Sequence, residues 1–579
     1  MAPSTLDLFT LTFNCAKNLI NVAVFASHLQ AALSQNATGL PDLVVFSLQE
    51  FAPLSYSFIG SYFLSPYYTR FEEALNLAAV NVAASVPDAA TNGFATDASS
   101  SLLPGGNGAG DQQSTWGGNG GSRTPLNRPY QLIRAKNVGM TAIMLFARTP
   151  EAIQNVKEAE CGFGAADMGN KGAVGLQITY VEPKDDGGVD EERGEPAQKR
   201  STEFTFVATH LAAMEWNLRR RNANWRSIVS GLTFANPKSV LPAAAAAGVE
   251  DGHAPVEAFG AADLPEEADG RLFPAGAEDE DAQPLLSRCS DPDSLAPAHD
   301  LALQNISIFR PTSYLFLAGD LNYRISTTTP PPLAPFPRLD PASPDYYPRF
   351  LERDQLAQER AARRTLHGMQ EADVRFPPTY KLIVQDSPAG AENEAEVRRA
   401  EAEGRSGEVV PFKWAAHRWP GWCDRVVYLD VPGWTRRRLA AREKKKIDKG
   451  GGDAAGSEEP RVRVLAYDAL PVQRTSDHRP VFQRATVPLL TPEELRLPTA
   501  AEGEGPAGPA VAEAELEDPR VRAPAPVDVG AWERRARARR REVVVGWSMF
   551  VWSTREGAVL IATALVVGVG AWWVWQGLW

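Results

Sequence analysis

Short apolar runs that end in a polar residue recur along this chain, and they constrain its fold more than any other feature. The clearest run is Tyr314–Ala318, which stops at Gly319 and is followed at once by Asp320 and Asn322. A short, aromatic-rich run bounded by a breaker is typical of a buried strand. A loop directly after such a strand can hold an acidic and an amide side chain at the edge of the core, where they suit the orientation of a water molecule. Taken alone, the stretch is equally consistent with a plain polar turn.

The same pattern occurs elsewhere in the chain, which strengthens the first interpretation. An apolar run over 43–48 leads to Glu50, and another over 204–209 ends in His210. Further polar side chains flank strand-like runs at Asp424 and at His478. Five segments would then deliver Glu, His, Asp and Asn side chains to a common rim. This combination predicts a metal-assisted hydrolase site assembled from distant parts of the chain.

Composition bounds the class of protein. The 579 residues are 44% hydrophobic, which is enough for a large core. The four cysteines are scattered without zinc or disulfide spacing, which fits a reducing compartment such as the cytosol. A net charge of −12 weakens any interpretation as a general nucleic-acid binder, so no nucleic-acid partner is predicted, and no specific protein partner can be inferred.

Several segments are too polar or too rich in Ala, Gly and Pro to form a core, and we expect them to be disordered insertions in surface loops. They lie near 83–128, 182–201, 236–300, 386–410 and 447–460. What remains is roughly 300 residues of strand and helix pattern, which fits a single catalytic domain within 1–485. Residues 486–542 are expected to be a disordered linker that ends in a basic run.

The C-terminal region contains an uncharged apolar run over 557–577 that is rich in tryptophan near its end. A helix of about 20 residues at 1.5 Å per residue spans roughly the 30 Å hydrocarbon thickness of a bilayer. The arginine-rich run over 534–541 should stay on the cytosolic side. We therefore expect a single-pass tail anchor with the catalytic domain in the cytosol, and a short span favours the endoplasmic reticulum over thicker membranes.

With these residues in view, the chain resembles the inositol polyphosphate 5-phosphatases of the endonuclease/exonuclease/phosphatase superfamily. The two most specific motifs are Gly319–Arg324 (GDLNYR) and Pro420–Arg425 (PGWCDR). Weaker motifs follow the family's order: Thr12–Asn14, Leu48–Glu50, Met168–Val174, His210–Ala213, Phe376–Lys381 and Ser476–His478. The resemblance implies an α/β (α+β) DNase I-like fold, in which a two-sheet β-sandwich is flanked by helices, followed here by the C-terminal transmembrane helix.

The resemblance also implies Mg²⁺-dependent removal of a 5-phosphate by direct attack of water. Glu50 would hold the Mg²⁺, with Asn14 beside it, since hard cations prefer oxygen ligands. Asp320 would orient and deprotonate the attacking water, and Asn322 would help to position the water or the phosphate.

Further roles follow from the same resemblance. His210 and His478 would bind phosphoryl oxygens, and Asp424 would keep His478 oriented or protonated. Contacts to the other ring phosphates are expected from Asn170, Lys171, Tyr380, Lys381 and Arg425. Cys423 is not expected to be a nucleophile, because no Cys-x₅-Arg loop surrounds it.

Three positions depart from the family's usual pattern. Met214 stands where many members carry a second histidine, Gly421 replaces a usual Ala or Ser, and Leu317 takes the place of a frequent Trp. None of these changes removes a group that hydrolysis requires.

These observations lead to the hypothesis of a tail-anchored phosphoinositide 5-phosphatase that acts on a membrane lipid. Phosphatidylinositol 4,5-bisphosphate is the first candidate substrate and the 3,4,5-trisphosphate the second. Three alternatives stay open at this point: activity on soluble inositol polyphosphates, another hydrolase of the superfamily such as a nuclease or sphingomyelinase, and an inactive membrane-tethered lipid binder.

Overall fold

The central strands carry apolar side chains on both faces. In β1 (Thr5–Asn14), Leu6 and Leu8 point into one buried cluster, whereas Phe9 and Leu11 point into another. Successive side chains of a strand face opposite sides of a sheet, so such a strand must be covered on both faces. The computed structural model describes residues 4–85, 128–183, 200–241, 298–448, 459–498, 515–553 and 555–578.

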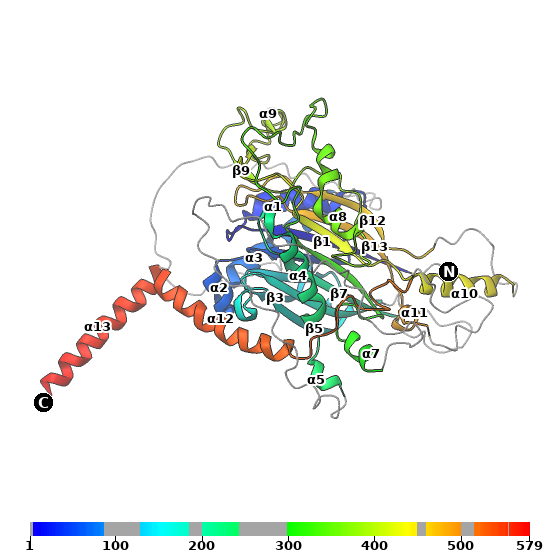
Figure 1. Cartoon of the computed structure of the whole chain (residues 1–579). Helices are drawn as coiled ribbons and strands as arrows, with labels where there is room; N and C mark the ends of the chain where they lie inside the picture. The colour runs from blue at the N-terminus through cyan, green and yellow to red at the C-terminus, as the bar shows by residue number, and fades with distance from the viewer. Residues whose placement is uncertain are drawn as a thin grey trace, which may run out of the picture.

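Two main β-sheets stack face to face in the described part of the chain (Figure 1). The first has the order β12-β13-β1-β2-β4-β3, in which β1 and β2 are parallel. The second has the order β11-β8-β7-β6-β5, in which β7 and β8 are parallel. The strands of the first sheet besides β1 are β2 (Leu43–Gln49), β3 (Gln131–Val138), β4 (Thr141–Ala147), β12 (Arg463–Ala469) and β13 (Val481–Pro488). Those of the second are β5 (Ile153–Gly162), β6 (Gly172–Val181), β7 (Ser201–His210), β8 (Ser313–Asp320) and β11 (Asp424–Tyr428).

The core lies between the two sheets. Val45 and Leu145 of the first sheet belong to the same buried cluster as Phe206 and Phe316 of the second. A hydrogen bond crosses the interface, because Ser47 Oγ donates to the carbonyl of Ala318 at 2.8 Å. The predicted two-sheet sandwich flanked by helices is therefore confirmed.

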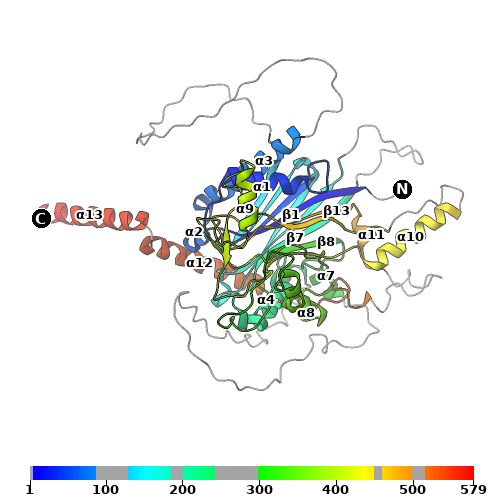
Figure 2. The same ribbon diagram turned by 90° about the horizontal axis from the view of Figure 1, so that it is seen from above.

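Helices cover the outer faces of the sheets (Figures 1 and 2). The first sheet is covered by α1 (Val22–Ser34) and α3 (Ser65–Ser85), and the second by α4 (Leu218–Gly231), whose Trp225 packs in the same cluster as Leu317. The other α-helices are α2 (Leu54–Ile59), α5 (Pro237–Val240), α7 (Ala298–Gln304), α8 (Gln355–Ala361), α9 (Glu394–Ala402), α10 (Gly433–Asp448), α11 (Pro492–Leu495), α12 (Ala531–Ser553) and α13 (Arg555–Gly577). Short 3₁₀ helices are η1 (Ser61–Phe63), η2 (Pro150–Ala152), η3 (Ala165–Asp167), η4 (Glu215–Asn217) and η5 (Tyr347–Arg353), and β9 (Leu382–Val384) pairs with β10 (Phe412–Trp414).

Two predictions about disordered segments are wrong. The segment 386–410 contains α9, whose Val397 and Ala400 are buried together with Val409. The expected linker 486–542 contains α11 and the first half of α12, and Arg535 and Glu542 of α12 are buried. Both segments were judged by their polar composition, which does not reveal that a charged side chain has a buried partner elsewhere in the chain. The other four expected insertions lie largely outside the described residues.

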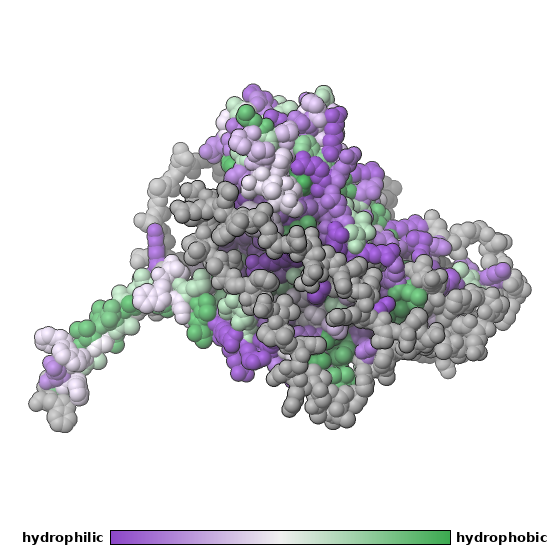
Figure 3. All heavy atoms as spheres, viewed as in Figure 1, coloured by the Kyte–Doolittle hydropathy of each residue, from purple (hydrophilic) through white to green (hydrophobic). Residues whose placement is uncertain are grey.

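The last helix is the strongest candidate for a membrane span. Within α13, residues Gly557–Gln576 form a 20-residue stretch with a mean hydropathy of 2.0, and 6% of it is buried against the protein. Figure 3 shows the apolar residues along this helix, and Figures 1 and 2 show it projecting from the end of α12. Length and composition are thus sufficient for a span.

Candidate active site

The register of the sheets brings the polar strand ends to one edge of the sandwich. Asn14 pairs with Gln49 at the ends of the parallel strands β1 and β2, so Glu50 follows directly beside Asn14. His210 pairs with Asp320 at the ends of β7 and β8, and Asp424, at the start of antiparallel β11, also pairs with Asp320. Parallel strands that end together place their last side chains side by side, so the predicted rim follows from strand pairing.

Asp320 is the centre of this edge. Its Oδ2 accepts a hydrogen bond from Asn14 Nδ2 at 3.0 Å and lies 3.3 Å from His210 Nε2 and 3.9 Å from His478 Nε2. Burial raises the pKa of Asp320, but His478, His210 and Lys171 outweigh that effect and lower the pKa below its usual range. The side chain is therefore an ionised hydrogen-bond acceptor at neutral pH.

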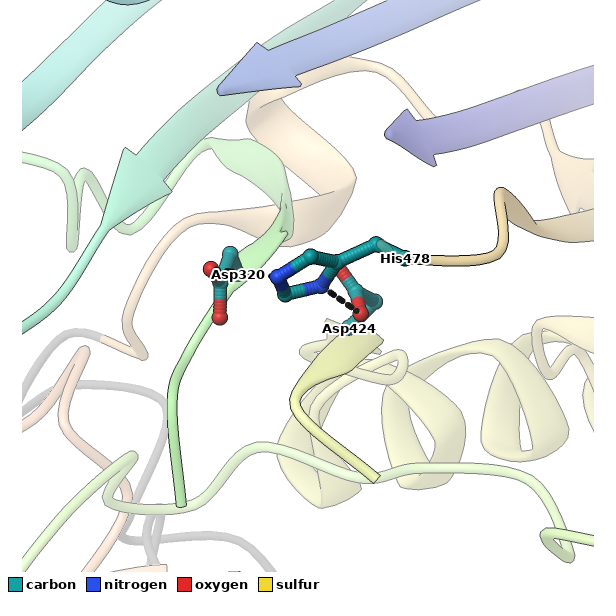
Figure 4. Close-up of side chains that lie close together, drawn as sticks. All are labelled: Asp320, Asp424 and His478. Atoms are coloured by element: carbon teal, nitrogen blue, oxygen red, sulfur yellow. Dashed lines mark hydrogen bonds and ion pairs between the residues drawn. The ribbon is translucent and has the colours of Figure 1, made fainter. Parts of the chain in front are cut away.

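Asp424 and His478 form a hydrogen-bonded pair beside Asp320 (Figure 4). His478 Nδ1 lies 2.8 Å from Asp424 Oδ2, which also accepts a hydrogen bond from Thr379 Oγ1 at 2.7 Å. Burial lowers the pKa of His478, but the carboxylates of Asp424 and Asp320 raise it to about 9. His478 is therefore a cation at neutral pH, with Nε2 turned toward Asp320.

The pKa of Asp424 moves in the opposite direction to that of Asp320. Burial raises it to about 6, His478 opposes that rise, and the charge of Asp320 adds to it. Its Oδ1 has no hydrogen-bond partner among the described residues. Two buried carboxylates that share one imidazolium form a coupled unit. Oxygen and nitrogen atoms of Asp320, Asp424 and His478 lie close enough to surround a cation. We interpret Asp424 and His478 as a hydrogen-bonded pair and not as ligands of Mg²⁺, because Mg²⁺ prefers oxygen to imidazole.

His210 is held beside Lys171, which comes from the loop before β6. Lys171 Nζ lies 2.9 Å from His210 Nε2, and the ring is buried. Burial lowers the pKa of His210 and Lys171 lowers it further, whereas Asp320 and Glu50 oppose this shift. Nε2 faces both the Lys171 ammonium group and the Asp320 carboxylate. Nδ1 has no hydrogen-bond partner in the part of the chain that the structure describes.

Glu50 supplies a carboxylate to the same edge from a strained turn after β2. Its φ is +42°, a conformation that non-glycine residues seldom adopt, and its Oε2 lies 3.1 Å from Lys17 Nζ. Burial raises the pKa of Glu50, but His210, Lys17 and Lys171 together lower it. The carboxylate is ionised and 26% exposed. Asn14 Oδ1 accepts a hydrogen bond from the Ala16 N–H at 3.1 Å, and a carbonyl oxygen keeps a second lone pair. An ionised carboxylate with such an oxygen on the neighbouring strand suits Mg²⁺, which keeps several waters.

Asn322 and Tyr380 lie behind the reacting edge. The carboxamide of Asn322 is held by Arg324, which donates to Oδ1, and by the carbonyl of Leu211, which accepts from Nδ2 at 3.2 Å. The Tyr380 ring lies 4.6 Å from the His478 ring and 4.2 Å from the Arg324 guanidinium carbon. These contacts order the loop after β8 and support the imidazole of His478.

Lys381, a predicted substrate ligand, lies at the rim. Its Nζ lies 3.3 Å from Asp477 Oδ2, and both side chains are partly exposed. An ammonium group there can contact phosphates of a ring substrate. The Oδ1 of Asn170, another predicted ligand, is instead buried against Gly164 without a hydrogen-bond partner among the described residues.

Arg425 does not belong to the site, and its predicted role as a phosphate ligand is wrong. Its guanidinium is buried on the opposite face of β11, where Nη1 lies 3.0 Å from Asp354 Oδ2 and Nε lies 2.6 Å from Glu371 Oε1. Nη2 donates to the second oxygen of Glu371 at 2.8 Å. Each nitrogen of the guanidinium therefore contacts one of these two buried carboxylates and faces away from the site.

Some residues at the site were not predicted to contribute. Thr379 donates to Asp424 and accepts from the Cys423 and Asp424 backbone N–H groups at 3.2 and 3.3 Å. It lies directly before Tyr380, so its position in the motif was the available signal. Lys17, which pairs with Glu50, carries no sequence signal, because it reaches the site only through the turn after β1. The Met214 thioether, at the departure from the usual histidine, lies 3.0 Å from Arg418.

The sequence of this chain is similar to those of known proteins. Residues 119–484 match the family described as Endonuclease/Exonuclease/phosphatase family 2. Type II inositol polyphosphate 5-phosphatase 14 of Arabidopsis thaliana is 28% identical over 283 residues, which are 49% of this chain and 18% of that protein. A polyphosphatidylinositol phosphatase of Saccharomyces cerevisiae is 30% identical over 114 residues, which are 19% of this chain and 9% of that protein. The matched segment is thus less than a fifth of these relatives' own length.

Among solved structures, one similar chain is the inositol polyphosphate 5-phosphatase domain of SPsynaptojanin, in complex with inositol (1,4)-bisphosphate and a calcium ion. The superposition covers 84% of both chains at 17% identity, with a TM-score of 0.43.

Proposed function

Because this chain belongs to Endonuclease/Exonuclease/phosphatase family 2 and is similar to inositol polyphosphate 5-phosphatases, we propose that it hydrolyses the 5-phosphate of an inositol phosphate or phosphoinositide. The observation that supports this most directly is the set of side chains that surround Asp320. Its ionised carboxylate lies within 4 Å of Asn14, His210 and a cationic His478. An acceptor for water beside donors for a phosphoryl group is what direct hydrolysis requires.

In this proposal, Asp320 accepts a hydrogen bond from the attacking water and aligns it with the phosphorus. The lowered pKa makes Asp320 a weak base. That is sufficient if the transition state is loose, because the proton then leaves the water late in the reaction. Asn14 fixes the carboxylate through its amide, so the water is directed by a rigid acceptor.

His478 and Lys171 would stabilise charge on the transferring phosphoryl group. The imidazolium of His478 is kept oriented and protonated by Asp424. Lys171 carries a positive charge to the same region, where His210 Nε2 lies between its ammonium group and Asp320. Donors held in place before the reaction need no rearrangement when charge develops.

A divalent metal fits this site at Glu50 and Asn14, and we propose Mg²⁺. The metal would supply Lewis-acid stabilisation of the phosphoryl oxygens. Glu50 is ionised and partly exposed, as a ligand of a partly hydrated cation should be.

We further propose that the substrate is a membrane lipid, with phosphatidylinositol 4,5-bisphosphate as the first candidate. The apolar helix α13 follows α12, and α12 packs against α2 and η3. In the sequence, α2 closely follows Glu50 and η3 closely precedes Lys171. We therefore place the candidate span and the site on the same side of the domain. Anchoring would raise the local concentration of lipid headgroups at that side. We also propose that α13 is a single span in the membrane of the endoplasmic reticulum, with the catalytic domain in the cytosol.

The test is phosphate release by the full chain from micelles that contain single phosphoinositides, and from soluble inositol phosphates, with Mg²⁺ or with a chelator. We expect Mg²⁺-dependent release that is fastest with phosphatidylinositol 4,5-bisphosphate. Asp320→Ala should abolish release, whereas Asp373→Ala, at an aspartate that is 82% exposed, should not. Release that persists in Asp320→Ala would contradict the mechanism, and faster turnover of soluble inositol phosphates would contradict the lipid assignment.

A further inference from the structure

The helix that leads to the candidate span contacts the loop that carries two predicted substrate ligands. This loop, residues 163–171, joins β5 to β6 and ends in Asn170 and Lys171. Glu542 of α12 is fully buried, and its Oε1 accepts a hydrogen bond from the backbone N–H of Gly169 at 2.7 Å. A helix far along the sequence therefore holds a peptide group two residues before Lys171.

Arg535, one further buried residue of α12, completes the contact. Its guanidinium donates to both carboxylate oxygens of Glu542. It also donates to Glu160 Oε2 at 2.9 Å and to the carbonyl of Asp167 at 3.1 Å. Arg535 and Glu542 thus contact the loop at Asp167 and Gly169 and strand β5 at Glu160.

The loop needs such support because its backbone is strained. Ala166 and Asp167 are consecutive non-glycine residues with φ of +53° and +61°. Non-glycine residues are disfavoured in this region, and they persist only where surrounding contacts impose them. The contacts from α12 reach Asp167 itself, through its carbonyl and through a 3.2 Å ion pair between its carboxylate and Arg534.

The opposite side of the loop is closed by the turn between β3 and β4. A Cβ atom on Gly169 would lie 2.5 Å from Val138 Cγ1, and one on Gly139 would lie 1.5 Å from the Gly169 carbonyl oxygen. The peptide at Gly169 therefore lies between this turn and the Glu542 carboxylate. Shortening the side chain of Glu542 should move the chain toward the space left on the α12 side, and Lys171 would move with it.

Stability alone is a weak explanation for this buried ion pair. Burying two charges costs desolvation free energy that their attraction repays only in part, and apolar replacements are often no less stable. A buried pair that also fixes a peptide N–H is better explained by the geometry that it imposes.

We propose that Glu542 is a positioning residue for Lys171, through which α12 sets the ammonium group against His210 and Asp320. This inference rests on the proposed phosphatase activity, since it assigns Lys171 to substrate binding. The Glu542 carboxylate itself is not a catalytic residue, because its contacts are to Gly169, Arg535 and Arg539. The helix that joins the domain to its candidate span would thereby also shape the substrate site.

The experiment is a double-mutant cycle with the full chain in micelles that contain phosphatidylinositol 4,5-bisphosphate. We expect Glu542→Ala to lower kcat/KM about tenfold, mainly through KM, because misplacing a binding group weakens its contact. Lys171→Ala should lower kcat/KM further. If Glu542 acts through Lys171, the double variant should be no worse than Lys171→Ala alone.

Two controls separate positioning from folding. Glu542→Gln keeps an acceptor for the Gly169 N–H and should recover part of the lost kcat/KM. Glu533→Ala removes the same side chain from α12 at a position that is 40% exposed and paired with Lys238, so it should have no effect. Fully additive losses in the cycle, or a loss in Glu542→Gln as large as in Glu542→Ala, would overturn the inference. Inactivity of the unmodified chain would instead refute the proposed function.

Discussion

Asp424 and Arg425 are neighbours in the sequence, both are buried, and both belong to charged clusters, yet the clusters differ in kind. The guanidinium of Arg425 is matched by Asp354 and Glu371 on one face of β11. On the other face, Asp424 shares the single cation His478 with Asp320, and its Oδ1 has no partner among the described residues. The first cluster has two cations, Arg425 and Arg360, for its two carboxylates, although Asp354 Oδ1 also has no partner among the described residues. In the second cluster, two carboxylates share one cation.

This difference teaches that a buried charge is not in itself a sign of function. The carboxylates around Arg425 favour its charged form, as in any ion pair that supports a fold. Around Asp320, one carboxyl pKa is lowered and the other is raised to about 6. Opposed pKa values in adjacent acids that share one cation mark the cluster around Asp320 as the candidate site.

The largest expected effect comes from the cluster of Asp320, Asp424 and His478, which we call the unmatched cluster. Asp320→Asn keeps the shape of the side chain but removes the charged acceptor, so kcat should fall about 10²–10⁴-fold. Phosphate release from phosphatidylinositol 4,5-bisphosphate measures this, and circular dichroism confirms that the variant is folded. A loss in KM alone would show that Asp320 binds substrate without directing water.

A substitution in the cluster of Arg425, Asp354 and Glu371, which we call the matched cluster, should lower stability instead of activity. Arg425→Met leaves Asp354 buried without a cation and Glu371 with Arg360 alone, which should cost about 3–5 kcal/mol of unfolding free energy. Urea unfolding measures the cost, and KM of the folded enzyme should be unchanged. Arg375→Met, at an arginine that is 83% exposed, is the control and should change stability by less than about 1 kcal/mol. A raised KM in Arg425→Met would return Arg425 to the substrate site.

The sequence contained enough information for the strand ends but not for every charged residue. His210, Asp320 and Asp424 could be predicted because they flank short apolar runs that form strands, and strand pairing brings these ends together. Asn14 was predicted from the family resemblance alone. Arg425 was misassigned by its position in a motif, although consecutive residues of a strand must face opposite sides of the sheet.

The role of α12 could not be predicted, for a different reason. Its arginine-rich composition is typical of a solvated segment, and nothing local distinguishes Arg535 from the exposed arginines around it. Its partners, Glu160 and the peptide of Gly169, are more than 350 residues away in the chain. Contacts of such long range are fixed by tertiary packing and leave no periodic trace in sequence.

The metal site extends the comparison to a third carboxylate, which is only partly buried. Glu50→Gln should raise the Mg²⁺ concentration needed for half-maximal activity about 10–100-fold, because the amide is a weaker ligand than the carboxylate. Titration of Mg²⁺ into chelator-treated enzyme measures this. Glu72→Gln, at a surface glutamate paired with Arg128, should leave the titration unchanged. An unchanged Mg²⁺ requirement in Glu50→Gln would place the metal elsewhere.

The smallest effect at neutral pH, and the sharpest test of the unmatched cluster, is the alkaline limb of the pH profile. The pKa of His478 is raised to about 9, so kcat/KM should be maintained below that pH and fall as the pH rises through it and the imidazolium loses its proton. Asp424→Asn removes a negative charge that sustains this pKa, so the limb should shift downward, toward the ordinary histidine value of about 6.5. At pH 7 the variant should then lose only a few-fold in rate, and at pH 6 it should lose less. A limb that stays near pH 9 in Asp424→Asn would show that another group controls it, and the two faces of β11 would then differ less than their contacts indicate.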